Sequence, residues 1–128
     1  MTYSNDILVQ VPEEVSDLEL ERKLNARWKE LISNLSSLPV PGAPALTAAQ
    51  REHLAGENIP VNVQGAGVDP ATIAILISLT PLIKAIVPLV QPFATNAADL
   101  AHTVALDLWN HLKDRLWHED HISLQEKS

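Results

Sequence analysis

The sequence predicts an all-α fold: a small helical bundle of four to five helices, with a proline-bent central apolar helix and an extended N-terminal lead-in. Leucine and alanine are abundant, whereas the 128 residues include only four glycines, three tryptophans, one tyrosine and one phenylalanine. This composition favours helices over the turns and aromatic strands of a β-sandwich. Two stretches repeat apolar residues at three- to four-residue spacing, the period of a helix with one buried face. A third stretch, residues 69–94, is apolar nearly throughout.

Length and charge restrict the class of protein. At 128 residues the chain has the size of a single domain, 1–128. Its net charge of −7 argues against nucleic acid as a partner, because phosphate backbones attract an excess of Lys and Arg. The chain has no cysteine, which excludes thiol catalysis and Cys-ligated zinc. Residues 1–15 lack the basic region of a signal peptide, so we expect a cytoplasmic protein that can associate with a membrane after activation.

The N-terminal part is expected to contain one long helix. Ile7–Val11 could form a strand, but without an obvious partner strand it is interpreted as an extended lead-in. Ser16 and Glu19 form a capping-box pattern that opens an amphipathic helix over 16–38. Its apolar face is spaced at three to four residues and consists of Leu20, Leu24, Trp28, Leu31, Leu35 and Leu38.

A linker, a short helix and a loop are expected next. Prolines make residues 39–46 a linker, and Thr47 with Gln50 predicts a capping box for a short helix over 47–55. Residues 57–68 are expected to be a loop with a brief extended piece. Its G-x-G pattern lacks the third glycine and the βαβ context of a dinucleotide site, so no cofactor is expected.

The apolar segment 69–94 is predicted to be helical, with Asp69 as its N-cap and Pro70 in its first turn. Prolines remove backbone donors inside a helix and bend or break it. The expected bend positions are Pro81, Pro88 and Pro92.

Residues 70–93 are long enough to cross a membrane. On an insertion scale their Ile, Leu, Val and Phe residues contribute roughly −5 kcal/mol, of which Lys84 alone offsets about 3 kcal/mol. The segment is therefore marginal between lipid and a protein interior, and burial among amphipathic helices is favoured in the soluble state. The residues predicted to face a membrane or a partner are Ile73, Leu76, Ile77, Leu82, Ile83, Ile86, Leu89, Trp109 and Trp117.

The last helix is predicted over 96–118, capped by Thr95 or Asn96, and is followed by a polar tail over 119–128. Three late histidines make a metal site conceivable, but a solvated helix end is the favoured interpretation. They are His111, His118 and His121. No metal, catalytic residue or enzymatic activity is expected.

The stretch GAGVDPATIAILISLTPLIKAIV, followed by LDLWNHL, resembles small bacterial accessory or effector proteins encoded beside proteases or signalling ATPases in conflict and defence systems. The matching residues are Gly65, Gly67, Asp69, Pro70 and Asp107 to Trp109. The three later prolines and Lys84 depart from that pattern. The resemblance implies an accessory or effector role switched by a partner protease.

Two functions remain after these exclusions. The first is a latent membrane-active effector, whose apolar segment 70–93 is shielded until a partner or a cut within 39–46 or 57–68 releases it. The alternative is a soluble helical interaction module or oligomerising accessory subunit. Both need a protein partner, which could be a protease or a second copy. The expected core consists of Leu20, Trp28, Leu31, Ile73, Leu76, Ile77, Leu100, Val104 and Leu108.

Overall fold

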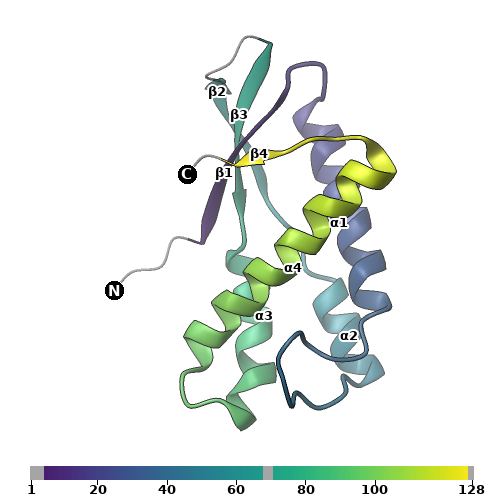
Figure 1. Cartoon of the computed structure of the whole chain (residues 1–128), viewed down its shortest axis with the longest axis vertical. Helices are drawn as coiled ribbons and strands as arrows, with labels where there is room; N and C mark the ends of the chain where they lie inside the picture. Colours follow the sequence, from purple (N-terminus) through teal and green to yellow (C-terminus); the bar gives the residue numbers. More distant parts are fainter. Residues whose placement is uncertain (1–4, 68–70, 127–128) are drawn as a thin grey trace.

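The computed structural model describes residues 5–67 and 71–126, and these form a mixed α/β fold of one antiparallel sheet and four α-helices (Figure 1). The predicted all-α class and helical bundle are therefore wrong. In chain order the elements are β1 (Asp6–Pro12), α1 (Asp17–Ser33), α2 (Ala48–Ala55), β2 (Val61–Ala66), β3 (Thr72–Ser78), α3 (Thr80–Val90), the 3-10 helix η1 (Gln91–Phe93), α4 (Ala97–Asp120) and β4 (Gln125–Glu126).

The sheet has the strand order β2-β3-β1-β4. β1 and β3 are its inner strands and pair over seven residues, from Asp6 opposite Ser78 to Pro12 opposite Thr72. The lead-in Ile7–Val11 is therefore a strand whose partner lies more than sixty residues further along the chain. The sequence did not identify that partner, because a short run with an apolar centre fits a buried strand and a buried helix equally well.

The apolar segment 69–94 is divided between strand and helix. Its first part, TIAILIS, forms β3, in keeping with the preference of β-branched residues for strands. Pro81 lies in the first turn of α3, where a missing N–H costs nothing, while Pro88 lies inside α3 and Pro92 lies in η1. The apolar segment is therefore interrupted between β3 and α3, and not inside one bent helix. The predicted caps at Asp69 and Pro70 lie outside the described residues.

The other helices follow their capping signals. Ser16 Oγ accepts a hydrogen bond from Glu19 N at 3.0 Å, but α1 ends at Ser33, before the predicted end. Thr47 and Gln50 form the full capping box of α2, and Asn96 caps α4. The predicted loop 57–68 contains β2, and the predicted polar tail contains the last residues of α4 and then β4.

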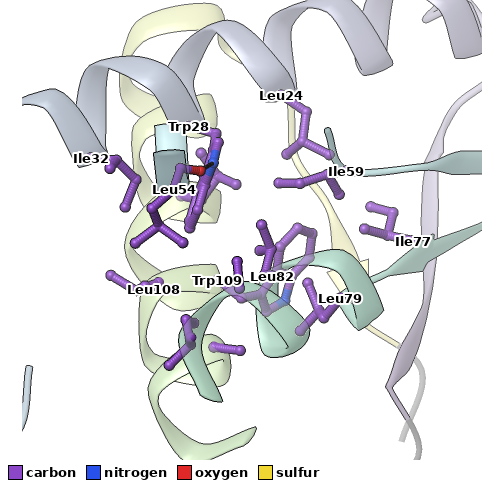
Figure 2. Packing of buried hydrophobic residues seen from close by; sticks show 14 of the residues in the cluster. Leu24, Trp28, Ile32, Leu54, Ile59, Ile77, Leu79, Leu82, Leu108 and Trp109 are labelled. Carbon is purple, nitrogen blue, oxygen red and sulfur yellow. Dashed lines mark hydrogen bonds between the residues drawn. The ribbon is translucent and has the colours of Figure 1, made fainter. Parts of the chain in front are cut away.

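The hydrophobic core lies between the sheet and the helices, where side chains from all four helices converge (Figure 2). Trp28 of α1 is fully buried, and its Nε1 donates to the carbonyl of Leu54 in α2 at 3.0 Å. Five expected core residues are buried: Leu20, Trp28, Ile77, Val104 and Leu108. Three others pack against the core and are partly buried: Leu31, Ile73 and Leu100. The ninth, Leu76, lies on the other side of the sheet.

An ion-pair cluster joins the middle of α1 to the end of α4. Arg27 donates from Nε and Nη2 to the two carboxylate oxygens of Asp120, at 2.9 and 3.0 Å. Its Nη1 also donates to Glu30 at 2.8 Å and lies 3.3 Å from Glu119. The hydrogen bonds from Arg27 hold the pKa of Asp120 below its usual range, against the opposing effect of burial. Because Asp120 is only 7% exposed, this pair fixes the two helices to each other.

Candidate interaction surface

The two faces of the sheet have different surroundings. Successive side chains of a strand point to opposite faces. Val9 and Val11 of β1, with Ile75 and Ile77 of β3, are fully buried on the face that the helices cover. In Figure 1, α1 and the C-terminal end of α4 lie beside the sheet, whereas α2 and α3 lie past its lower end. The alternate residues of β1 and β3 therefore point away from the helices.

The strand pairing places these outward residues in rows across the sheet. Leu8 lies opposite Leu76, which lies opposite Asn62 of β2. In the next row Gln10 lies between Ala74 and Gln125 of β4. We call the accessible part of these rows the open sheet face; it consists of Leu8, Asn62, Ala74, Leu76 and Gln125. None of these side chains is charged, and Leu8 is 36% exposed. The next outward row pairs the exposed Asp6 with Ser78, so a carboxylate lies on the same face beside Leu8.

One end of the open sheet face is sealed by the segment that leaves β2. Gln10 is only 6% exposed although it points to this side, and its Oε1 accepts a hydrogen bond from Thr72 Oγ1 at 3.0 Å. Gly67 N donates to the carbonyl of Thr72 at 2.9 Å. A Cβ atom at Gly67 would lie 2.1 Å from Thr72 Oγ1 and 2.8 Å from Gln10 Oε1. This glycine is therefore required for close packing, which gives the G-x-G pattern a structural explanation.

The outer edges of the sheet are short or irregular. β2 has a register shift between Val63 and Gly65, and Gly65 has a φ of 143°. Such bulges are one way in which proteins protect an edge strand from pairing with another chain. At the other edge, β4 pairs with β1 at only two positions, Val9 and Gln10. The regular surface of the sheet is therefore its open face.

β4 is held by polar contacts on the helix side. Glu126 accepts a hydrogen bond from Trp109 Nε1 and lies 2.8 Å from Lys113 Nζ, both in α4. Burial on its own would raise the pKa of Glu126, but the hydrogen bonds from Lys113 and Trp109 outweigh burial and leave that pKa lowered. These contacts fix β4 at the edge of β1, and with it Gln125 on the open sheet face.

The predicted membrane- or partner-facing residues do not form one surface. Four of them are fully buried in the core: Ile77, Leu82, Ile86 and Trp109. Ile73, Ile83 and Leu89 are partly buried against that core. Trp117 is 52% exposed on α4, and Leu76 lies on the open sheet face. Sequence reasoning missed Leu8, Asn62, Ala74 and Gln125. Leu8 carried no signal, because the run ILVQV is apolar on both sides of it and only Gln10 marks the outward face.

The late histidines are spread along α4 and its end. His118 Nε2 lies 3.2 Å from Asp114, His121 lies edge-on to Trp117, and His111 is exposed. Within 5–67 and 71–126, no group of three His, Asp or Glu side chains lies close enough to hold a metal ion. A shallow hollow of about 290 Å³ beside Trp117 is lined by Lys113 and Asp114, whose side chains already contact Glu126 and His118. No arrangement of nucleophile and base occurs there.

Comparisons with protein-family models, with curated proteins and with solved structures found no match to this chain. In the described part of the chain, no helix combines the length and the apolar character needed to cross a membrane.

Proposed function

We propose that this protein acts by association and not by catalysis, as an accessory subunit that forms oligomers. One observation carries the proposal: the helices cover a single face of the sheet, and the opposite face presents the Leu8–Leu76 pair without a charged neighbour in its row. The chain as a whole carries a net charge of −7. A leucine pair on a sheet face that no helix covers, with Leu8 exposed and Leu76 half-buried, is typical of a protein–protein contact.

The open sheet face has the features of a contact surface and not of a leftover part of the core. Leu8, Ala74 and Leu76 do not pack against the hydrophobic core, whereas Ile73, on the opposite face of β3, does. Amide side chains flank the leucines at Asn62 and Gln125. An apolar centre with a polar rim, which here includes the carboxylate of Asp6, is the common anatomy of a protein interface.

The latent membrane effector has less support from the geometry. Its segment 70–93 includes β3, which is paired with β1 on one side and β2 on the other. It also includes α3, whose Leu82 and Ile86 are fully buried. Release of this segment would dismantle the sheet and much of the core. Membrane insertion, a cut within 39–46 or 57–68, and activation by a partner protease remain predictions.

Sedimentation equilibrium from about 1 μM to about 1 mM, the range of moderate to weak affinities, tests the proposal. We expect a mass that rises with concentration towards a defined oligomer. Flotation with anionic and neutral liposomes, before and after limited proteolysis, is the parallel measurement, and we expect no binding. A monomer at every concentration contradicts the oligomerising subunit. Dye leakage that follows cleavage would replace it with the membrane effector.

A further inference from the structure

Resting on the proposed function, we infer that Trp109 and Lys113 of α4 form a carboxylate-binding site, which Glu126 of a second copy fills in the oligomer. The two copies swap their C-terminal segments, residues 122–126, so that β4 of each copy pairs with β1 of the other. In the closed single chain the same site holds the chain's own Glu126. The inference uses α4 and one edge of the sheet, and it does not depend on the open sheet face.

The site is built from two donors on one helix. Trp109 is only 1% exposed, and its Nε1 donates to a carboxylate oxygen of Glu126. Lys113 lies one turn further along α4, with its Nζ 2.8 Å from the same oxygen and 6.0 Å from the centre of the Trp109 ring. Neither an indole N–H nor an ammonium group accepts a hydrogen bond, so the ligand must bring the acceptor. A carboxylate on an extended strand meets this need and balances the charge of Lys113.

The segment that carries Glu126 is held by contacts that a second copy reproduces. β4 pairs with β1 at two positions, Val9 and Gln10. Ahead of β4, Ile122 is 5% exposed and Leu124 packs against the core. These contacts join residues 122–126 to the body of the domain, and an identical copy supplies all of them unchanged. The balance between the closed and the swapped forms is therefore decided at the hinge.

The hinge is His121, which ends α4 in a left-handed conformation with a φ of 56°. Ile122 N then donates to the carbonyl of Leu116 at 3.2 Å, and the chain turns back towards β1 (Figure 1). Glycine is usual at this position, because a Cβ in the left-handed region disfavours the turn by about fivefold or more. In the swapped form His121 takes a right-handed helical φ, which lengthens α4 and directs the segment away from its own domain. Each copy thereby loses an unfavourable backbone conformation.

The magnitudes set the concentration at which the swap occurs. A segment on a short tether has an effective concentration in the mM range at its own site, which favours the closed chain. Relief of about fivefold at each of two hinges lowers the dissociation constant by about 25-fold. We therefore expect swapped dimers at roughly tens of μM and closed monomers below that range.

Charge favours a second copy over an unrelated acidic partner. The segment Ile122 to Glu126 carries a single charge, the carboxylate that Lys113 pairs with. A second copy brings this carboxylate in register with Ile122 and Leu124. An acid-rich strand from another protein lacks that register and is repelled by a chain whose net charge is −7.

Mixing two single-cysteine variants tests the swap directly. Gln10 and Gln125 lie opposite each other in the pairing of β1 with β4, where side chains are close enough for a disulfide. Because the chain has no cysteine, a Gln10→Cys chain and a ¹⁵N-labelled Gln125→Cys chain can form disulfides only between chains. We expect mass spectrometry to show the mixed dimer in roughly tenfold or greater excess over either like pair. Random collision gives no such excess.

Variants at the hinge test the cause without touching the sheet. His121→Gly adopts the turn freely, so the dissociation constant of the dimer should rise roughly tenfold or more. His121→Ala is the matched control, because it removes the same ring from its edge-on contact with Trp117 but keeps the Cβ. Its dissociation constant should stay within about threefold of wild type. Sedimentation equilibrium measures both variants, and thermal melting confirms that both are folded.

Glu126→Gln tests the carboxylate-binding site itself. The charged contact with Lys113 is weakened equally in the closed and swapped forms, so the dissociation constant should change by less than about threefold. Release of β4 becomes easier, and labelled and unlabelled dimers should mix roughly tenfold faster. An unchanged mixing rate would show that the site does not hold the segment.

The outcomes separate this inference from the proposed function. Preferential mixed disulfides together with a dimer weakened by His121→Gly support the swap. An oligomer that shows neither effect overturns the swap while the oligomerising subunit stands. A folded chain whose dimer dissociates on addition of oligoglutamate would assign the site to a different acidic partner and overturn the second copy as its occupant. A wild-type chain that stays monomeric overturns both proposals.

Discussion

On β3, side chains that are neighbours in the sequence lie in different environments. Ile75 and Ile77 are fully buried beneath the helices, while Leu76 between them points to the open sheet face. The same alternation on β1 separates Val9 and Val11 from Leu8. The backbone is equally regular on both sides, so the environments differ because of what packs against each face. The packing that stabilises the fold is concentrated on one side of the sheet, and the surface proposed for association is on the other.

The largest expected contrast is between Ile75→Ala and Leu76→Ala. Truncating the buried Ile75 leaves a cavity and should lower the free energy of unfolding by about 3–4 kcal/mol. Truncating Leu76, which does not pack against the core, should cost about 1 kcal/mol or less. Urea unfolding at a protein concentration below that of association measures both. Equal losses would show that the open sheet face is as well packed as the covered one.

A second contrast concerns the ion pairs that hold the helical layer together. Asp120→Asn should lower the free energy of unfolding by about 1.5–3 kcal/mol, because Asp120 accepts two charge-assisted hydrogen bonds from Arg27. Asp114→Asn on the same helix is the control, because Asp114 is 71% exposed and its pair with His118 should contribute little. A loss from Asp114→Asn as large as that from Asp120→Asn would show that burial of the pair is unimportant.

The stabilisation by the Arg27–Asp120 pair should also depend on pH, in a direction that the pKa of Asp120 fixes. The pKa of Asp120 is lowered in the folded state, whereas an unfolded aspartate titrates at about 3.9. The stabilising contribution is therefore complete above the unfolded pKa and is lost as the pH falls through the lower folded value. Asp120→Asn should reduce the loss of stability on acidification below about pH 4. Urea midpoints measured along a pH series provide the test, and an unchanged acid slope would contradict it.

The smallest expected effect comes from the seal at the end of the open sheet face. Gly67→Ala places a methyl group 2.1 Å from Thr72 Oγ1, so the segment must shift, at a cost of about 1–2 kcal/mol. Gly56→Ala is the matched control, because Gly56 has a helical φ of −76° and its added Cβ would meet the nearest atoms at 3.5 Å. That control should be neutral or slightly stabilising in thermal melts. A Gly67→Ala variant with unchanged thermal stability would mean that Gly67 and Thr72 are not closely packed.

Local signals predicted local structure well. The caps at Ser16, Thr47 and Asn96 start α1, α2 and α4 where the sequence indicated, because a cap depends on residues within one turn. The sheet could not be predicted in this way. Pairing of β1 with β3 depends on residues far apart in the chain, and an apolar run such as TIAILIS carries no period that separates a buried strand from a buried helix.

The candidate surface was predictable only in part. Leu76 was expected to face a partner, but as a residue of a helix, so its neighbours were wrongly assigned. Its actual neighbours, Leu8 and Asn62, come from two other strands and become a group only when the sheet register is known. Trp117 was also expected to face a membrane or a partner; it is exposed on α4, away from this surface.

The position of β3 between β1 and β2 has a consequence for the rate at which the apolar segment can be exposed. Strands paired on both sides usually open only when the whole domain unfolds, and their amide protons are then among the slowest to exchange with solvent. Residues 72–78 should accordingly exchange at the rate set by global unfolding, while the edge strand β4 exchanges through local opening. Any process that frees this segment is then limited by the unfolding rate of the domain. The apolar segment is therefore kept buried by the slow unfolding of the domain as well as by the free energy of folding.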